Sequence, residues 1–229
     1  NLTVEANQQA APTSGNFVGV DVGGLLHSSG TGVVTVKGKG GDDSSGSSAN
    51  AGVNVTDSGA VSGTNAATVT VTGTGGAGDA DAAVAGGTNS AASGDILVAG
   101  VKNGSGLGAD VVVDAPVTAS AGGDIEIRSD RHVTGSAGGD ISSDGTSSDG
   151  NITITADEDS ADGPNGAGTI QLAGNISAGD GAVTFRLADC DGWVGATAGD
   201  LENVAAALAR LADALPGLNR VLAHLAPYI

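Results

Sequence analysis

The stretch Val34-Thr35-Val36-Lys37-Gly38-Lys39-Gly40-Gly41 returns 35 residues later as Val69-Thr70-Val71-Thr72-Gly73-Thr74-Gly75-Gly76. Both copies alternate apolar with polar residues and end in glycines, which is typical of a half-buried β-strand followed by a turn. Shorter stretches of the same kind precede them at 19–22 (Gly-Val-Asp-Val) and 52–55 (Gly-Val-Asn-Val). Each long period therefore contains two predicted strands, and repetition at this spacing favours a repeat architecture.

The second half of the chain uses a shorter unit, in which a glycine and a small or polar residue precede aliphatic residues at every second position. It occurs at 94–98, 123–127, 150–154, 168–172 and 181–187. Strands this short cannot bury their apolar side alone. Stacked in parallel they would form internal aliphatic columns, so we expect an all-β fold, a parallel β-solenoid. Coils of ~20 residues would give about eight or nine coils and a rod of ~40 Å. The alternative, an antiparallel sandwich, fits the recurrence of short strands less well because the sequence itself repeats.

The composition excludes several classes of protein. The chain has 229 residues with 41 glycines, 5 prolines, one cysteine, few aromatic residues and a formal net charge of -18. Glycine does not recur at every third position, so the chain is not collagen. No run of ~20 apolar residues occurs, so we expect no membrane insertion. So acidic a surface repels phosphates, which makes nucleic acid a poor partner.

The repeats resemble those of a known group of proteins. The Gly-Asn-Ile-Thr-Ile unit at 150–154 and the Gly-Gly-Asp-Ile unit at 122–125, set among turns rich in Gly, Ser and Asp, are similar to repeats of filamentous-haemagglutinin-like proteins and of giant bacterial surface β-strand-repeat proteins. The resemblance covers roughly residues 1–190. It implies a right-handed parallel β-helix and an extracellular or cell-surface location, with a role as an adhesin or stalk. It names no ligand or host surface.

The last residues differ in composition from the rest. We predict a solenoid over 1–199 and an α-helical hairpin over 200–229, because residues 201–229 are neutral and hold seven leucines and eight alanines. Asp200 is a suitable N-cap, and Pro216-Gly217 ends the first helix. An apolar stripe at helical spacing lies between them: Leu201, Val204, Leu208, Leu211 and Leu215. Two interpretations stay open. The stripe caps an exposed strand edge of the solenoid, or it docks another subunit to give a homo-oligomer or filament.

Aspartate is the commonest charged residue, and turn chemistry is its simplest explanation because Asp tolerates tight corners. Calcium binding is the more specific hypothesis, since carboxylates and turn carbonyls are the hard oxygen ligands that calcium prefers. The nearest approach to a calcium-binding repeat is 75–81, with a second acidic group at 157–162. The sequence predicts these candidate ligands: Asp79, Asp81, Asp157, Asp159 and Asp162. No other cofactor is expected.

Enzymatic function has less support in the sequence. Arg128-Ser129-Asp130-Arg131-His132 concentrates ionisable groups as polysaccharide-cleaving β-helices do, and a carboxylate pair there could act as acid and base. No aromatic residue, the usual platform for a sugar ring, lies within 50 residues of His132. We therefore expect a non-enzymatic rod or stalk with no catalytic residues, and a carbohydrate-active lyase or hydrolase stays the alternative.

Overall fold

A computed structural model describes the structure of residues 1–9, 14–41, 50–56, 59–64, 68–75, 82–85, 88–91, 94–101, 110–145, 149–157 and 168–187. These residues belong to one compact unit, Asn1–Asp189. The predicted boundary at Asp200 and the predicted hairpin over 200–229 lie outside them. No helix in the described part of the chain is long and apolar enough to cross a membrane.

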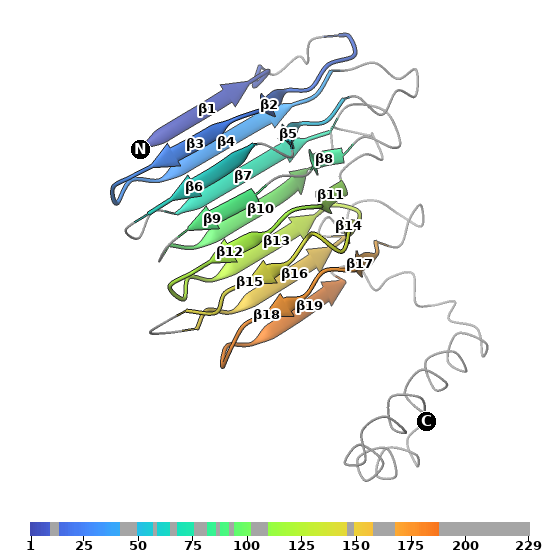
Figure 1. Cartoon of the computed structure of the whole chain (residues 1–229). Coiled ribbons are helices and arrows are strands. Elements are labelled where there is room, and N and C mark those ends of the chain that lie inside the picture. Colours follow the sequence, from blue (N-terminus) through green and yellow to red (C-terminus); the bar gives the residue numbers. More distant parts are fainter. Residues whose placement is uncertain are drawn as a thin grey trace, which may run out of the picture. The chain divides into compact units, whose positions relative to one another are not determined.

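The unit is built from three parallel sheets, each of which receives one strand from every coil (Figure 1). The 7-stranded sheet, called sheet A, consists of β1 (Leu2–Ala6), β4 (Val34–Lys39), β7 (Val69–Thr74), β10 (Ile96–Val101), β13 (Ile125–Ser129), β16 (Ile152–Ala156) and β19 (Val183–Leu187). The first 6-stranded sheet, sheet B, consists of β2 (Val20–Val22), β5 (Val53–Val55), β8 (Ala82–Ala85), β11 (Asp110–Val113), β14 (Val133–Gly135) and β17 (Ile170–Leu172). The second, sheet C, consists of β3 (Leu25–Ser28), β6 (Ala60–Gly63), β9 (Thr88–Ala91), β12 (Val117–Ala119), β15 (Ile141–Ser142) and β18 (Ile176–Ser177).

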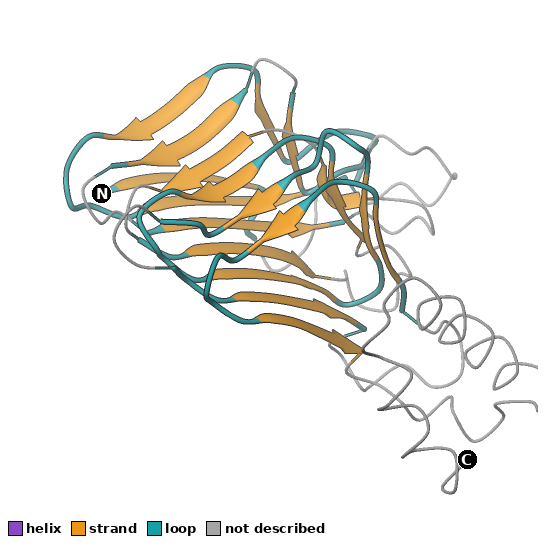
Figure 2. Ribbon diagram, turned by 60° about the horizontal axis from the view of Figure 1, so that its bottom comes forward, coloured by secondary structure: helices purple, strands orange, loops and turns teal. Residues whose placement is uncertain are grey.

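Every strand pairing among the described residues is parallel. The predicted parallel β-solenoid is therefore confirmed, and the antiparallel sandwich is wrong. The sheets face one another around a shared interior (Figure 2). Such an arrangement needs no helix to return the chain, because each strand is followed in the sequence by a strand of the next sheet and meets its parallel partner only one coil later.

The predicted coil length is wrong. The residues that begin each strand of sheet A lie opposite one another, at intervals of 32, 35, 27, 29, 27 and 31 residues: Leu2, Val34, Val69, Ile96, Ile125, Ile152 and Val183. Each coil contains three strands rather than two. The unit therefore spans six coil steps from β1 to β19, about 29 Å at ~4.8 Å per step, and not the ~40 Å expected from shorter coils.

The interior consists of aliphatic columns, as the alternating pattern predicts. In sheet A, Val34, Val69, Ile96, Ile125 and Ile152 stack in register and are at most 1% exposed. Sheets B and C add further buried valines and isoleucines to the same cluster. A fully buried side chain of this size contributes ~1.5–3 kcal/mol relative to an exposed one. These β-branched side chains therefore stabilise the stack without the large aromatic residues of a sandwich core.

Glycine before the sheet A strands permits close stacking of the coils. A Cβ on Gly123 would lie 2.1 Å from the carbonyl oxygen of Gly94, and a Cβ on Gly150 would lie 2.1 Å from that of Gly123. Non-bonded carbon atoms ordinarily stay ~3.5–4.0 Å apart. The recurrent glycine of the sequence unit is therefore required by the spacing between coils.

Candidate functional site

A column of polar side chains follows these glycines at the corner between sheets C and A. The Asp95 Oδ1 atom accepts a hydrogen bond from the backbone N–H of Asp124 (3.0 Å). Asp124 Oδ1 in turn accepts from the backbone N–H of Asn151 (2.7 Å), and Asn151 Oδ1 accepts from that of Ala182 (3.1 Å). We call Asp95, Asp124 and Asn151 the corner ladder. Each member joins its own coil to the next.

Other aspartates accept hydrogen bonds from the next coil in the same way. Asp140 Oδ1 accepts from the backbone N–H of Asn175 at 2.8 Å, one coil further along. Asp149 accepts from the backbone N–H groups of Asp180 (2.8 Å) and Gly145 (3.0 Å), and these bonds hold the pKa of Asp149 below its usual value. These aspartates lie at corners, as turn chemistry suggests, but most of these bonds reach the neighbouring coil rather than their own turn.

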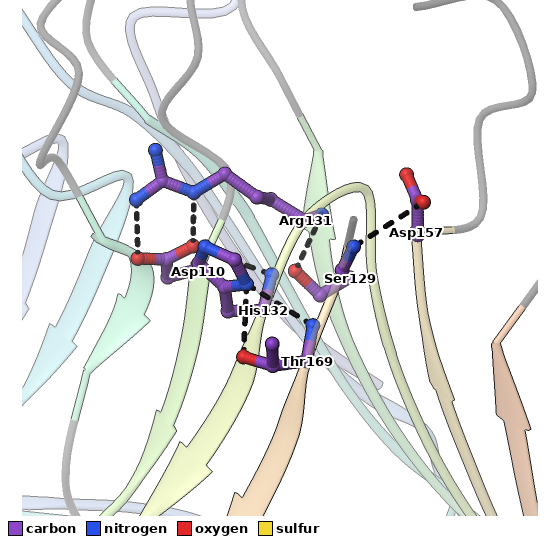
Figure 3. A network of polar contacts seen from close by, with 7 residues as sticks. Asp110, Ser129, Arg131, His132, Asp157 and Thr169 are labelled. Atoms are coloured by element: carbon purple, nitrogen blue, oxygen red, sulfur yellow. Dashed lines mark hydrogen bonds and ion pairs between the residues drawn. The ribbon is translucent and has the colours of Figure 1, made fainter. Parts of the chain in front are cut away.

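The segment that concentrates ionisable groups lies where sheet A passes to sheet B (Figure 3). Arg131 binds Asp110 of the preceding coil through two hydrogen bonds, from Nε to Oδ1 and from Nη2 to Oδ2, both 2.8 Å long. About four-fifths of each side chain is shielded from solvent. Paired, partly buried contacts of this kind are stronger than exposed ion pairs. We call Asp110, Arg131, His132 and Thr169 the Arg131 network.

His132 links this network to the following coil. Its Nδ1 atom accepts a hydrogen bond from the backbone N–H of Thr169 (3.1 Å) and lies 3.0 Å from the Thr169 hydroxyl oxygen. Its backbone N–H donates to Asp110 (3.3 Å). Burial lowers the pKa of His132, and the carboxylate of Asp110 opposes that effect. Acceptance from a backbone N–H requires an unprotonated Nδ1, so this geometry holds the imidazole in its neutral form.

A catalytic site at this segment would bring Asp130 and His132 to carboxylates from adjacent coils. Asp110 does reach this segment, but both of its carboxylate oxygens bind the Arg131 guanidinium. The ring of His132 contacts Thr169 instead. These hydrogen bonds join three consecutive coils.

Asp157 is the candidate calcium ligand that lies within the described residues. It adopts a left-handed backbone conformation (φ 61°), and its Oδ2 atom accepts from the backbone N–H of Gly168 (3.3 Å). In the described part of the chain, no three His, Cys, Asp or Glu residues gather in a way that could hold a metal ion. The other calcium candidates, Asp79, Asp81, Asp159 and Asp162, lie outside the described residues. The calcium site stays a prediction.

The docking stripe also stays a prediction. All five of its members lie outside the described residues: Leu201, Val204, Leu208, Leu211 and Leu215. The same is true of Cys190.

The outward face of sheet A carries most of the described positive charge. Of the five described lysines and arginines, four lie on this face: Lys37, Lys39, Arg128 and Arg186. Lys37 is 3.8 Å from Glu5 across adjacent strands. Threonine occupies five of the seven positions in the neighbouring outward column: Thr3, Thr35, Thr70, Thr153 and Thr184. This polar face is visible only once the coils are aligned, because each repeat alone shows one or two of its members.

Sequence reasoning missed Asp110 and Thr169 as partners of the basic segment. They lie 21 residues before Arg131 and 37 residues after His132. Local spacing holds no signal for either contact. Correct alignment of three-strand coils would have brought Asp110 next to the start of β14.

Comparison with known proteins adds no relative: no family model, curated protein or solved structure matches this chain. The fold is therefore established by the chain's own strand pairing. The resemblance of the repeats to filamentous-haemagglutinin-like proteins remains an expectation from the sequence.

Proposed function

We propose that this chain is a non-enzymatic structural module of a bacterial extracellular or cell-surface protein, in which stacked coils act as a rod or stalk. The continuous aliphatic columns support this proposal, since they run through every coil from β4 to β16 without interruption in sheet A. In such a solenoid each coil is stabilised chiefly by its neighbours. The length of the stack, rather than a particular pocket, then determines what the module does.

The observation that carries the proposal is the use of polar side chains between coils. The corner ladder and the Arg131 network direct carboxylate, guanidinium and imidazole groups onto the backbone or side chains of adjacent coils. Groups engaged in this way reinforce the stack. An acid–base catalyst instead needs a group within hydrogen-bond reach of a substrate proton.

The proposed location rests on the resemblance of the repeats, which points to the cell surface or its exterior. Excess acidic charge would keep such a repeat protein soluble. We further propose an adhesive role, with self-association into filaments as one means of extending the rod. The outward face of sheet A supports this role, because it offers hydroxyl and cationic groups on an otherwise acidic molecule.

The alternative function, cleavage of a polysaccharide, is tested at His132. We would incubate the full chain and its His132→Ala variant with acidic and neutral polysaccharides, and measure new reducing ends and unsaturated uronate products. The proposal predicts no products from either chain, and a lower thermal midpoint for the variant. Product formation that disappears with His132→Ala would overturn the proposal and favour a lyase or hydrolase.

A further inference from the structure

His132 belongs to a second ladder of side chains, at the corner between sheets A and B. Asp110, His132 and Thr169 lie at equivalent positions of three consecutive coils. Asp110 Oδ1 accepts a hydrogen bond from the backbone N–H of His132 (3.3 Å), and His132 Nδ1 accepts from that of Thr169 (3.1 Å; Figure 3). We call the second of these bonds the His132 rung. It has the geometry of the corner ladder, with an imidazole nitrogen in place of a carboxylate or amide oxygen.

The His132 rung replaces a strand hydrogen bond. β14 and β17 are parallel neighbours, and their register, continued by one step, would bring the Thr169 N–H to the carbonyl of Arg131. That carbonyl instead accepts from the backbone N–H of Asp157 (3.1 Å), where the chain leaves sheet A. The imidazole of His132 therefore supplies the acceptor that the Thr169 N–H would otherwise find in the sheet.

An imidazole acceptor responds to pH in a range where the other ladder acceptors do not. Carboxylate and amide oxygens accept hydrogen bonds throughout pH 5 to 8, whereas an imidazole nitrogen stops accepting when it binds a proton. The hydroxyl oxygen of Thr169 lies 3.0 Å from the same Nδ1 atom of His132. A protonated Nδ1–H can donate to this hydroxyl, so the ring keeps a partner while the Thr169 N–H loses its own.

The surroundings of the ring determine how readily it takes a proton. Among the described residues, the charged groups that face it are Asp110 of β11, Arg131 of its own turn and Asp157, which follows β16. Burial is the largest effect and lowers the pKa of His132, as does the Arg131 guanidinium, while the two carboxylates oppose them. The ring is therefore neutral at pH 7.5 and takes its proton in mild acid.

We propose that the His132 rung is an acid-sensitive switch between the coils that contain β14 and β17. At neutral pH the ring accepts from the Thr169 N–H and holds the start of β17 against the preceding coil. In mild acid the ring donates to the Thr169 hydroxyl instead, and the released N–H loosens the start of β17. The other corner bonds keep their acceptors, so the coils stay stacked. This local response goes beyond the rod function and does not depend on it.

Hydrogen exchange of single amides, followed by NMR in the full chain at pH 7.5 and 5.5, tests the switch. The chain contains a matched control, because the Asn175 N–H binds Asp140 Oδ1 (2.8 Å) between the same two coils. Each rate is divided by that of an unstructured amide at the same pH. We expect protection of the Thr169 amide to fall about fivefold at pH 5.5, where a released imidazole is about ten times more often protonated than neutral. Protection of Asn175 should change by less than about twofold.

Two variants assign the response to the ring. His132→Asn keeps an acceptor oxygen but has no proton to gain, so the protection of its Thr169 amide should not depend on pH. His27→Asn removes a histidine of β3 and should respond as wild type does.

Three results would overturn the switch: equal protection of Thr169 at both pH values, an equal loss of protection at Asn175, or a pH response that persists in His132→Asn. If His132→Asn fails to fold, the comparison of the Thr169 and Asn175 amides in wild type decides alone.

Discussion

Two residue types at adjacent positions hold the coils together. Glycine permits the backbone of one coil to approach that of the next, and the following Asp or Asn side chain bonds across the same gap. The Gly-Asp and Gly-Asn pairs of the sequence unit thus have one structural role. They set the spacing between coils and satisfy backbone N–H groups at a corner where no strand partner does so.

Gly150→Ala tests the spacing requirement. Its Cβ would lie 2.1 Å from the Gly123 carbonyl oxygen, so one coil must shift and we expect a loss of about 3 kcal/mol in the free energy of unfolding. Gly30→Ala is the matched control, because a Cβ there meets nothing within 4 Å. Its free energy should change by less than about 1 kcal/mol. Urea denaturation of both variants measures the difference, and equal losses would refute the spacing argument.

Asp124→Ala and Asp124→Asn separate hydrogen bonding from charge in the corner ladder. Alanine removes the acceptor that binds both the backbone and the side-chain nitrogen of Asn151, and should cost about 1 kcal/mol. Asparagine keeps an acceptor oxygen and removes a charge next to Asp95, so its stability should equal or exceed that of wild type. Thermal unfolding at low salt compares the variants. If the asparagine variant were as unstable as the alanine variant, the negative charge of Asp124, and not its role as a hydrogen-bond acceptor, would be what stabilises the ladder.

At the scale of strands, the sequence predicted sheet A well and sheet C poorly. The long alternating runs at 34–39 and 69–74 form β4 and β7 as expected. Sheet C includes strands as short as Ile141–Ser142 and Ile176–Ser177. Two residues cannot display an alternating pattern, so the third strand of each coil escaped prediction and the coil length was underestimated. The Arg131 network was missed for the same reason, because its contacts depend on that alignment.

The bond between His132 of one coil and Thr169 of the next predicts a pH dependence. Burial lowers the folded-state pKa of His132 below the ordinary 6.5, so the unfolded chain binds the proton more readily. Its contribution to stability is therefore complete above pH 6.5 and declines as the pH falls toward the folded-state value. His132→Asn keeps an acceptor near Thr169 but cannot titrate. We expect the free energy of unfolding of wild type, relative to that of the variant, to be lower at pH 5.5 than at pH 7.5. A constant difference would contradict this.

Asp110 and Arg131 join β11 to the start of β14, and a double-mutant cycle measures their coupling. Asp110→Asn and Arg131→Gln each break the paired contact, while the double variant removes both charges. We expect a coupling energy of about 1–2 kcal/mol, above the value for exposed ion pairs. Glu5 and Lys37, whose side chains are nearly half exposed, provide the control pair. Coupling no larger than that of the control pair would show that the network adds little to stability.

At the scale of the whole molecule, the stack of coils is the unit of organisation. The 27 residues from Ile125 to Asn151 form one coil interval, since Ile125 and Ile152 lie opposite each other in adjacent strands. Their removal would bring Ile152 next to Ile96 with the same inward alternation. It would also remove the whole segment that contains Arg131 and His132. A rod tolerates such a loss, whereas a catalytic centre at this segment does not.

Deletion of residues 125–151 therefore tests the central claim most directly, with deletion of 127–152 as the control. The control joins Glu126 to Thr153 within the strand, so Thr153 takes the inward position of Ile127 and Ile154 turns outward. We predict that the 27-residue deletion keeps a β-rich circular dichroism spectrum and one cooperative urea transition with a smaller m-value, because less surface is exposed on unfolding. The 26-residue deletion should be markedly less stable. Loss of cooperative unfolding in the in-register deletion, or equal stability of the two deletions, would contradict the account.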